Sequence, residues 1–352
     1  MSRIGVAFSS SGIAPGGIVE CVRLAEELGY ESAWMTEGHA GDQFAILGAC
    51  AIATTRIRLG TAISSVFVRS APTIAMAAAT VDHLSGGRLI LGLGSSHKVQ
   101  VEGEHGLPFD RPILRLRDTV AIVRALLRDG VVSHKGDVID IERFELWFTP
   151  LRKEMPIYLA ALFPKMLQIA GELAQGVLLT YPTLESGRRA AEHVAIGARR
   201  AGRRPEEIEI ASLLPCQVAD SAAEARERLR PGIAFYVGFF PRYNRLLAEA
   251  GFAGAVATVK AAWDRGDRDG AARLVPDALI DAVALAGTPA ECREKIERYR
   301  ASGIVLPIVT PRGGGPDPKA RVVAAIRACA PPPGDGGRAG ARGRGVIRSN
   351  SD

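Results

Sequence analysis

The sequence predicts a (β/α)8 TIM barrel of the α/β class, with insertions. Three observations favour this fold over a doubly wound sheet. Short apolar runs alternate with long helix-like stretches eight times along the chain. Most of these runs are continuously apolar, which is typical of parallel strands that helices cover on both faces. A doubly wound sheet normally closes after five or six strands, whereas eight units in 352 residues match a barrel.

The strands are expected where apolar runs lie between turn signals, at residues 4–9, 32–36, 57–63, 88–94, 156–161, 176–180, 208–218 and 304–310. Helical patterns follow them. In the first helix, apolar residues share one face from Ile18 to Leu28 before Gly29 ends it. Asp42 is the predicted N-cap of the second helix, and Pro72 lies in the first turn of the third.

Two stretches interrupt this alternation. Residues 129–155 contain two β-like runs around Gly136, which predict an inserted hairpin. Residues 221–275 predict a helical insertion. We therefore expect one barrel domain over residues 1–330. Residues 331–352 are rich in Pro, Gly and Arg with almost nothing to bury, so we expect a disordered tail there.

The composition fits a globular protein, with 47% hydrophobic and 23% charged residues. No apolar run reaches the roughly 18 residues of a membrane span, and the amino terminus enters a strand without a signal-peptide core. The five cysteines lie singly along the sequence, as in proteins of a reducing cytoplasm, which is the expected location. The net charge of +6 is interspersed along helices, so we expect no nucleic acid or membrane partner.

In a barrel of this kind, chemistry occurs where the strands end at their carboxyl side, because the following loops converge there. The residues at these ends are Ser9, 37–39, 62–64, 94–97, 160–161, 180–181, Cys216 and Arg312. Many of them are small or carry a hydroxyl group. This pattern suits a flat ligand that lies close to the backbone, with a few hydrogen-bond donors around its polar edges.

The stretch "GLGSSH" at residues 92–97 resembles half of a dinucleotide-binding fingerprint. A Rossmann fingerprint needs a third glycine and lies in the first strand–turn–helix unit. Here His97 replaces that glycine, the motif follows the fourth strand, and a polar stretch rather than a helix is expected after it. We interpret Gly92 and Gly94 as positions where another group approaches the backbone, with Ser95, Ser96 and His97 as donors at the rim.

No metal site stands out, because the histidines lack the paired spacing of a zinc helix and no carboxylate cluster accompanies them. The chain also lacks the GxSxG elbow of serine hydrolases. A mouth lined by glycine and serine, without a metal or nucleophile motif, indicates that a bound cofactor carries the chemistry.

Four stretches resemble the luciferase-like superfamily of flavin- and deazaflavin-dependent barrel oxidoreductases. They are "AWMTEGHAGDQFAILGACAIATTRIRLGTAI", "RSAPTIAMAAATVDHLSGGRLILGLGSSH", "PIYLAALFPKMLQIAGELAQGVLLT" and "AGTPAECREKIERYRASGI". Together they touch most of the chain from Arg3 to about Ala330, and "SGGRLILGLG" with "AGTPAEC" is the most specific pair. The likeness is strongest to the deazaflavin-dependent branch, which includes methylenetetrahydromethanopterin reductase-like enzymes that use coenzyme F420.

The resemblance implies three cofactor-binding segments. In the family, a bulge after the third strand, often with a non-prolyl cis peptide, supports the middle ring of the cofactor. The loop after the fourth strand meets the cofactor, and the loop after the fifth receives its phosphate-bearing side chain. The matching residues here are Ala62, Ile63 and Ser64 for the bulge, Gly94, Ser95 and Ser96 for the next loop, and Ala160, Ala161, Leu162 and Phe163 for the phosphate loop.

Three residues are candidates for catalytic proton management, namely His97, Glu37 and His39. His97 falls where some relatives place an acidic proton donor, and an imidazole with a pKa near neutrality suits that task. Glu37 and His39 match the polar end of the second strand, near the ring edge. For Glu37 an ion pair with Arg69 is the structural alternative.

Two residues depart from the pattern of the family. Phe163 stands where relatives commonly have glycine, and Gln175 stands where they commonly have Asp. A phenylalanine at position 163 would crowd the phosphate of the cofactor.

The leading interpretation is an F420-dependent oxidoreductase that transfers a hydride between the deazaflavin and an unsaturated or iminium-type small molecule. One alternative keeps the fold but uses FMN, as a monooxygenase that a partner flavin reductase supplies with reduced flavin. A second alternative is a non-catalytic barrel that binds a cofactor without turnover. The resemblance also implies a homodimer through the Ala-rich helices at 45–55 and 72–81.

Overall fold

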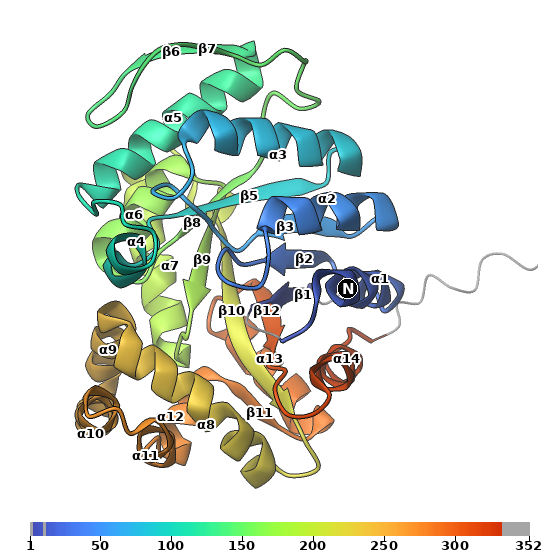
Figure 1. The fold of residues 1–352 in the computed structure, drawn as a ribbon, viewed down its shortest axis with the longest axis vertical. Coiled ribbons are helices and arrows are strands. Elements are labelled where there is room, and N and C mark those ends of the chain that lie inside the picture. Colours follow the sequence, from blue (N-terminus) through green and yellow to red (C-terminus); the bar gives the residue numbers. More distant parts are fainter. Residues whose placement is uncertain (1–2, 10–11, 333–352) are drawn as a thin grey trace, which may run out of the picture.

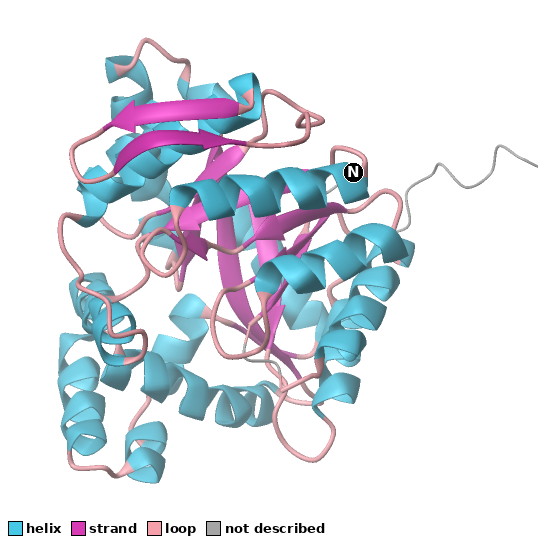
Figure 2. Cartoon of the chain, turned by 45° about the horizontal axis from the view of Figure 1, so that its top comes forward, coloured by secondary structure: helices cyan, strands magenta, loops and turns pink. Residues whose placement is uncertain are grey.

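The computed structural model describes residues 3–9 and 12–332. Within them, eight parallel strands close into a barrel that helices surround (Figure 1). Coloured by secondary structure, the barrel strands form the centre of the molecule with helices around them, and a separate two-stranded hairpin lies at its edge (Figure 2). The predicted (β/α)8 barrel is confirmed. The predicted tail lies outside the described residues from residue 333 onward.

The barrel strands follow one another round the ring in the order β1, β2, β3, β5, β8, β9, β10 and β12. Parallel pairing of β12 with both β1 and β10, and of β9 with β10, closes the ring. Their bounds are Gly5–Phe8, Ser32–Met35, Arg58–Thr61, Leu89–Gly94, Ile157–Ala160, Gly176–Thr180, Glu209–Val218 and Leu306–Pro311. Two short strands add to the sheet: β4 (Ser64–Ser65) pairs with β5, and β11 (Leu285–Gly287) pairs with the end of β10.

The helices that cover the barrel are α1 (Pro15–Glu27), α2 (Gln43–Ala53), α3 (Ala71–Ser85), α5 (Pro112–Asp129), α6 (Pro164–Leu173), α7 (Leu184–Arg200), α13 (Pro289–Ala301) and α14 (Pro318–Ala328). A 3-10 turn at Pro205–Glu207 precedes β10. Local side chains set several helix starts. Asp42 caps α2 as predicted, by accepting a hydrogen bond from the backbone N of Ala45 at 2.9 Å. Thr288 and Glu291 form a capping box on α13, which gives the "AGTPAEC" stretch a structural role.

Large side chains fill the amino-terminal end of the barrel. Trp34 and Tyr158 lie inside it with ring centroids 5.6 Å apart. The hydroxyl of Tyr158 donates a hydrogen bond at 2.6 Å to Glu209, the first residue of β10. A Cβ atom on Gly60 would lie 2.3 Å from the Trp34 ring, so this glycine makes room for the indole. Because this end is filled, open space is left at the carboxyl ends of the strands.

Both interruptions expected from the sequence are present. The hairpin consists of β6 (Val131–Lys135) and β7 (Asp140–Glu145), which pair antiparallel after α5. The helical insertion consists of α8 (Ala222–Phe239), α9 (Pro241–Leu247), α10 (Ala253–Asp264), α11 (Arg268–Arg273) and α12 (Asp277–Val283). It therefore extends past residue 275, and it has an apolar cluster of its own.

One run in this insertion differs from the sequence expectation about membrane spans. The run from Pro241 to Asp264 has 24 residues, and an 18-residue window within it has a mean hydropathy of 1.2, so its length and composition are those of a spanning helix. The run is not a continuous helix, since a π-helical turn at Ala248–Phe252 contains Gly251 with φ +97°. Its buried residues, such as Val259, pack into the apolar cluster of the insertion.

Three of the singly spaced cysteines come together in the fold. Cys216 ends up beside Cys329, with their Sγ atoms 3.9 Å apart, and Cys292 packs next to both. All three are buried. Their contact could not be predicted from their spacing in the sequence, because they belong to three separate elements: β10, α13 and the end of α14.

Candidate active site

A cavity of about 610 Å³ opens at the carboxyl ends of the barrel strands. This volume is typical of small-molecule sites. Most of the predicted site residues line it: Glu37, His39, Ala62, Ile63, Ser95, Ser96, His97, Ala160, Ala161, Leu162 and Phe163. The other two, Ser64 and Gly94, are buried behind the lining.

The chain bends at Ala62 and Ile63, between β3 and β4, and this bend faces the cavity. The backbone N of Ala62 donates to the carbonyl of Met35 at 2.7 Å, and the side chain of Gln43 donates to the carbonyl of Ile63 at 3.4 Å. The bend corresponds in place to the bulge that the resemblance implies. All peptide bonds of the described residues are trans, so the cis peptide common in the family is absent from the bend.

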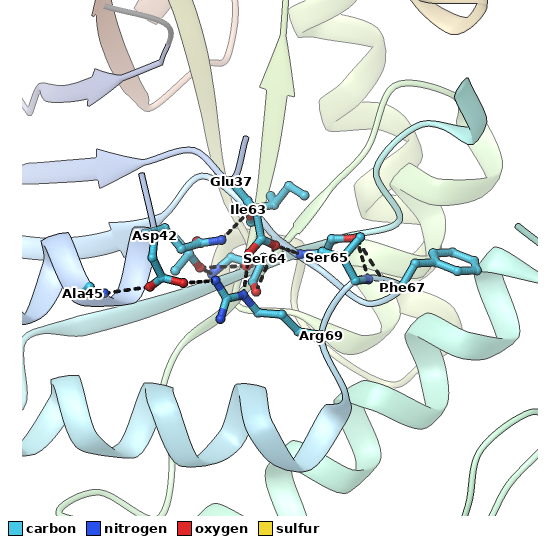
Figure 3. Close-up of polar contacts among 12 residues, drawn as sticks. Glu37, Asp42, Ala45, Ile63, Ser64, Ser65, Phe67 and Arg69 are labelled. Atoms are coloured by element: carbon cyan, nitrogen blue, oxygen red, sulfur yellow. Dashed lines mark hydrogen bonds and ion pairs between the residues drawn. The ribbon is translucent and has the colours of Figure 1, made fainter. Parts of the chain in front are cut away.

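Glu37 fixes the bend from the side of β2 (Figure 3). One of its carboxylate oxygens pairs with the guanidinium of Arg69, and the other accepts a hydrogen bond from the backbone N of Ser65 at 2.6 Å. Arg69 also pairs with Asp42, which places the guanidinium between two carboxylates. Glu37 therefore forms the ion pair considered as its structural alternative. Both carboxylate oxygens are engaged, so its contribution is to position β4 and the bend.

The two glycines of "GLGSSH" explain how β5 accommodates this bend. A Cβ on Gly92 would lie 1.9 Å from the carbonyl oxygen of Thr61, and a Cβ on Gly94 would lie 2.8 Å from the side chain of Ile63. The hydroxyl of Thr61 also donates to the carbonyl of Gly92 at 2.7 Å. The group that approaches the backbone of β5 is therefore the protein's own β3–β4 segment, which is held against the cavity.

The segment after this motif corrects one expectation. A short helix, α4 (Lys98–Gly103), begins directly after His97, where a polar stretch without a helix was expected. His97 occupies the N-cap position, but its side chain makes no capping hydrogen bond. The wrong expectation arose because the helix has only six residues, too few to show a periodic pattern.

The imidazole of His97 lies in an aromatic, water-poor part of the site. Its ring is 4.5 Å from that of Phe240 and 5.2 Å from that of Tyr243, measured between centroids. Burial and the nearby Arg242 guanidinium lower the pKa of His97 to about 4, so the expectation of a pKa near neutrality is wrong. Its Nδ1 atom is buried and has no hydrogen-bond partner among the described residues. His97, which lines the cavity, is therefore neutral at physiological pH.

His39 lies at the rim, and its side chain is 80% exposed. Its Nε2 lies 3.3 Å from the carboxylate of Glu104, just after α4, so the pair connects the β2 loop with the segment that follows β5. An exposed ion pair of this kind contributes little to stability.

The loop after β8 forms another wall of the cavity. Phe163 is the N-cap residue of α6, and the guanidinium of Arg245 lies over its ring at 4.6 Å from the centroid. The benzene ring thus stands between the start of α6 and this arginine. The second departure from the family pattern, Gln175, lies away from the cavity and accepts a hydrogen bond from the backbone N of Ile157 at 3.1 Å.

The helical insertion supplies site residues that sequence reasoning did not identify. The segment "FPRYNR" at 240–245, which comprises the residue after α8 and the first five residues of α9, contributes an aromatic wall and two arginines. Arg242 donates to the hydroxyl of Ser95 at 3.2 Å, which ties the insertion to the loop after β5. The alternation of aromatic and basic residues was the signal available in the sequence. It did not show that the segment folds back over the barrel mouth.

Comparison with known proteins places this geometry in a family. The sequence matches the model of the luciferase-like monooxygenases over residues 1–306. The chain belongs to the luciferase-like monooxygenase family. As a luciferase-like protein with this barrel and cavity, it is an oxidoreductase.

Two similar proteins are reductases of the methanopterin type. This chain is 30% identical to the 5,10-methylenetetrahydromethanopterin reductase of Archaeoglobus fulgidus over 304 residues, which cover 85% of this chain and 90% of the relative. The structure of the coenzyme F420-dependent tetrahydromethanopterin reductase from Methanopyrus kandleri is similar, with a TM-score of 0.82, 25% identity and coverage of 94% and 98% of the two chains.

A monooxygenase that was solved with FMN has a similar fold. The oxygenating component of the 3,6-diketocamphane monooxygenase from Pseudomonas putida, solved with FMN, matches with a TM-score of 0.68 over 94% of this chain and 97% of its own. At 18% identity this likeness concerns the fold alone.

Proposed function

We propose that this enzyme binds coenzyme F420 in the cavity and transfers a hydride between it and an unsaturated or iminium-type small molecule. The observation that carries the proposal is the bend at Ala62 and Ile63, which faces the cavity and is braced from behind by β5. The similarity to 5,10-methylenetetrahydromethanopterin reductase and to the F420-dependent structure supports the choice of cofactor.

The residues present fit a flat, tricyclic group. Small side chains leave the backbone of the bend accessible, and the cavity of about 610 Å³ is large enough for such a ring. Near the cavity, two buried polar atoms have no partner among the described residues: Nδ1 of His97, and Oε1 of Gln43, whose side chain contacts the bend.

Each wall has a separate task in this proposal. The bend at Ile63 would support the ring, and Ser95 and Ser96 would donate hydrogen bonds to its edges. The loop from Ala160 to Phe163, with the start of α6, would receive the phosphate-bearing side chain. When bound, F420 supplies or accepts the hydride at C5 of the deazaflavin. The protein positions the two reactants, which by itself lowers the barrier by several kcal/mol.

His97 contributes as a neutral imidazole. With a pKa of about 4 it does not act as a charged acid near pH 7. Its neutral ring can still donate or accept one hydrogen bond at a defined place, and the packing against Phe240 fixes its orientation. Its role here is to hold a polar atom of the ring or of the substrate.

A titration of the purified protein with F420 and with FMN tests the proposal. We expect saturable binding of F420, seen as a change in its fluorescence and as a rise in melting temperature, and weaker binding of FMN. Reduced F420 bound to the protein should cause no oxygen uptake, because a reduced deazaflavin reacts poorly with oxygen. No binding of F420, or tight binding of FMN with oxygen uptake when a flavin reductase is added, would overturn the proposal in favour of the monooxygenase.

The substitution Phe163→Gly distinguishes an active enzyme from a barrel that binds the cofactor without turnover. If its ring blocks the phosphate loop, Phe163→Gly should raise F420 affinity sharply, which would support cofactor binding without turnover. For an active enzyme we expect this substitution to change F420 affinity by less than about threefold, because Arg245 keeps its place through an ion pair with Glu249. Fluorescence titration of both proteins measures the difference.

A further inference from the structure

The cavity is lined by more arginines than carboxylates. Three arginines line it, together with two carboxylates, Glu37 and Glu104. Glu37 is already paired with Arg69, and Glu104 contacts the exposed imidazole of His39 at the rim. Of the three arginines, Arg245 pairs with Glu249, whereas Arg242 and Arg312 form no ion pair with any residue that the structure describes.

Arg312 is the more informative of these two. It follows β12, and its backbone N donates to the carbonyl of Cys216 at 3.0 Å, which fixes the start of the side chain. Its guanidinium donates to the hydroxyl of Tyr181 at 3.3 Å and lies over the ring of Tyr236, 5.8 Å from the centroid. An arginine carries five N–H donors in a planar fork, so most of them are left for a ligand.

The neighbours of Arg312 do not neutralise its charge. Burial raises the pKa of the Tyr181 phenol, which therefore stays protonated and uncharged at physiological pH. Tyr181 also has a φ of +54°, a conformation that non-glycine residues rarely adopt. Backbone strain of this kind persists where the surrounding structure enforces it, and it clusters at ligand sites. Here it accompanies the contact between the phenol and Arg312.

Aromatic side chains of the insertion lie on the same side of the cavity as the Tyr236 ring that Arg312 contacts. Phe235, Tyr236 and Phe240 of the insertion line the same cavity, and their rings pack on one another with centroid separations of 5.2–5.8 Å. A partly dehydrated guanidinium beside such a wall attracts an anion more strongly than one in water.

We propose that Arg312 binds the carboxylate of the substrate, so that the substrates are small carboxylic acids with an apolar or aromatic body. This inference rests on the proposed function for the position of the coenzyme at the Ile63 bend. In the ring of strands, β12 is separated from β3 by β1 and β2. The acid would therefore lie to one side of the bend, with its body along the aromatic wall.

The side chain of F420 also carries anionic groups, so the same chemistry has a second source. The phosphate loop, at residues 160–163, follows β8, and β9 and β10 separate β8 from β12. Arg312 is therefore not on the strand that carries the phosphate loop, and we assign the anion that it binds to the substrate. A separate titration tests whether the anion belongs to the coenzyme instead.

The test compares acids with their neutral amides. Benzoate and cinnamate, with benzamide and cinnamamide, are titrated by calorimetry into the protein with and without F420. We expect at least one acid to bind about tenfold or more tightly than its amide, and Arg312→Gln to abolish that preference. Arg312→Lys should keep part of it, because the charge remains but the fork is lost. Arg273→Gln, which removes an exposed positive charge outside the cavity, is the matched control and should keep all of it.

A parallel titration with F420 and with deazariboflavin, which lacks the phosphate and glutamyl groups, identifies the source of the anion. We expect Arg312→Gln to bind both as the wild type does. Weaker binding of F420 alone would assign Arg312 to the coenzyme and overturn the inference, as would equal affinity of every acid and its amide. A further outcome is that the protein binds acids in preference to amides through Arg312 and yet does not bind F420. That result would contradict the proposed function but support this inference. If Arg312→Gln does not fold, Arg312→Lys carries both comparisons.

Discussion

The side chain of Ile63 lies directly against the backbone of Gly94, so close that a Cβ on this glycine would be 2.8 Å from Ile63 Cδ1. The same Cβ would lie 3.3 Å from Ala160, the last residue of β8. Because Gly94 has no side chain, Ile63 can pack against β5, and this packing sets the position of the bend relative to the cavity. The second glycine of "GLG" is in this way a structural requirement of the bend.

Substituting Gly94→Ala should therefore push Ile63 into the cavity. We expect F420 affinity to fall at least tenfold, while the free energy of unfolding falls by roughly 1–3 kcal/mol, the usual cost of overpacking. Fluorescence titration and urea unfolding measure the two quantities. Gly103→Ala is the control, because a Cβ there meets nothing within 4 Å. It should lower neither the F420 affinity nor the free energy of unfolding. Unchanged affinity in Gly94→Ala would show that the bend does not support the coenzyme.

Glu37→Gln tests whether this residue positions the bend or transfers a proton. The amide keeps the shape of the carboxylate but loses the ion pair with Arg69, so β4 should be held less firmly. We expect F420 affinity to fall about five- to tenfold and the pH dependence of turnover to keep its shape. Asp42→Asn is the matched control, since it also weakens a pair with Arg69 but leaves a good N-cap on α2. Loss of one limb of the pH–rate profile in Glu37→Gln would instead mark Glu37 as a proton donor or acceptor.

Strand order and the position of most site residues could be predicted from the sequence because both depend on local patterns. Continuous apolar runs gave eight strands, and the barrel then places their carboxyl ends together, so 62–63, 95–97 and 160–163 could be assigned to one cavity. Boundaries shifted by one or two residues where an apolar residue continues a strand run without pairing. Ile304, for example, is buried although β12 begins at Leu306.

The rest depended on contacts between distant segments. The pKa of His97 is set by Phe240, Tyr243 and Arg242, which lie more than a hundred positions away in the insertion. No pattern near position 97 indicates that burial. Likewise, the family pattern gives Glu37 as a polar group at a strand end, but only the fold shows that Arg69 and Ser65 engage both of its oxygens.

We propose that the enzyme forms a homodimer through α2 and α3, as expected from their small residues. Ile52 is 70% exposed on α2, and Met76 and Leu84 are 43% and 46% exposed on α3. Leu84 lies against Gly48 of α2, so the three side chains lie on two helices that pack together. Burying this apolar surface against a second copy would favour association.

Light scattering coupled to size exclusion checks the oligomeric state. We expect a dimer for the wild type and a monomer for Ile52→Glu, because a carboxylate at the centre of the surface would lose its water without gaining a partner. Ile196→Glu changes another exposed isoleucine, on α7, and should stay dimeric. A wild-type monomer at high protein concentration, or a dimer that Ile52→Glu does not weaken, would contradict the proposed interface.

The depressed pKa of His97 makes the stability of the protein depend on pH in a defined direction. In the unfolded chain this histidine takes up a proton near pH 6.5, but in the folded protein only near pH 4, because burial and Arg242 oppose the charge. Between these values the unfolded state binds more protons, so stability is lost as the pH falls from 6.5 to 4. For a partly buried ring we expect a loss of roughly 1–2 kcal/mol between pH 7.5 and pH 5. His97→Gln cannot titrate and should lose less by that amount, as measured by urea unfolding of both proteins at the two pH values. Equal losses in the two proteins would mean that His97 titrates in the folded state as it does in water, and the aromatic pocket would then be open to solvent.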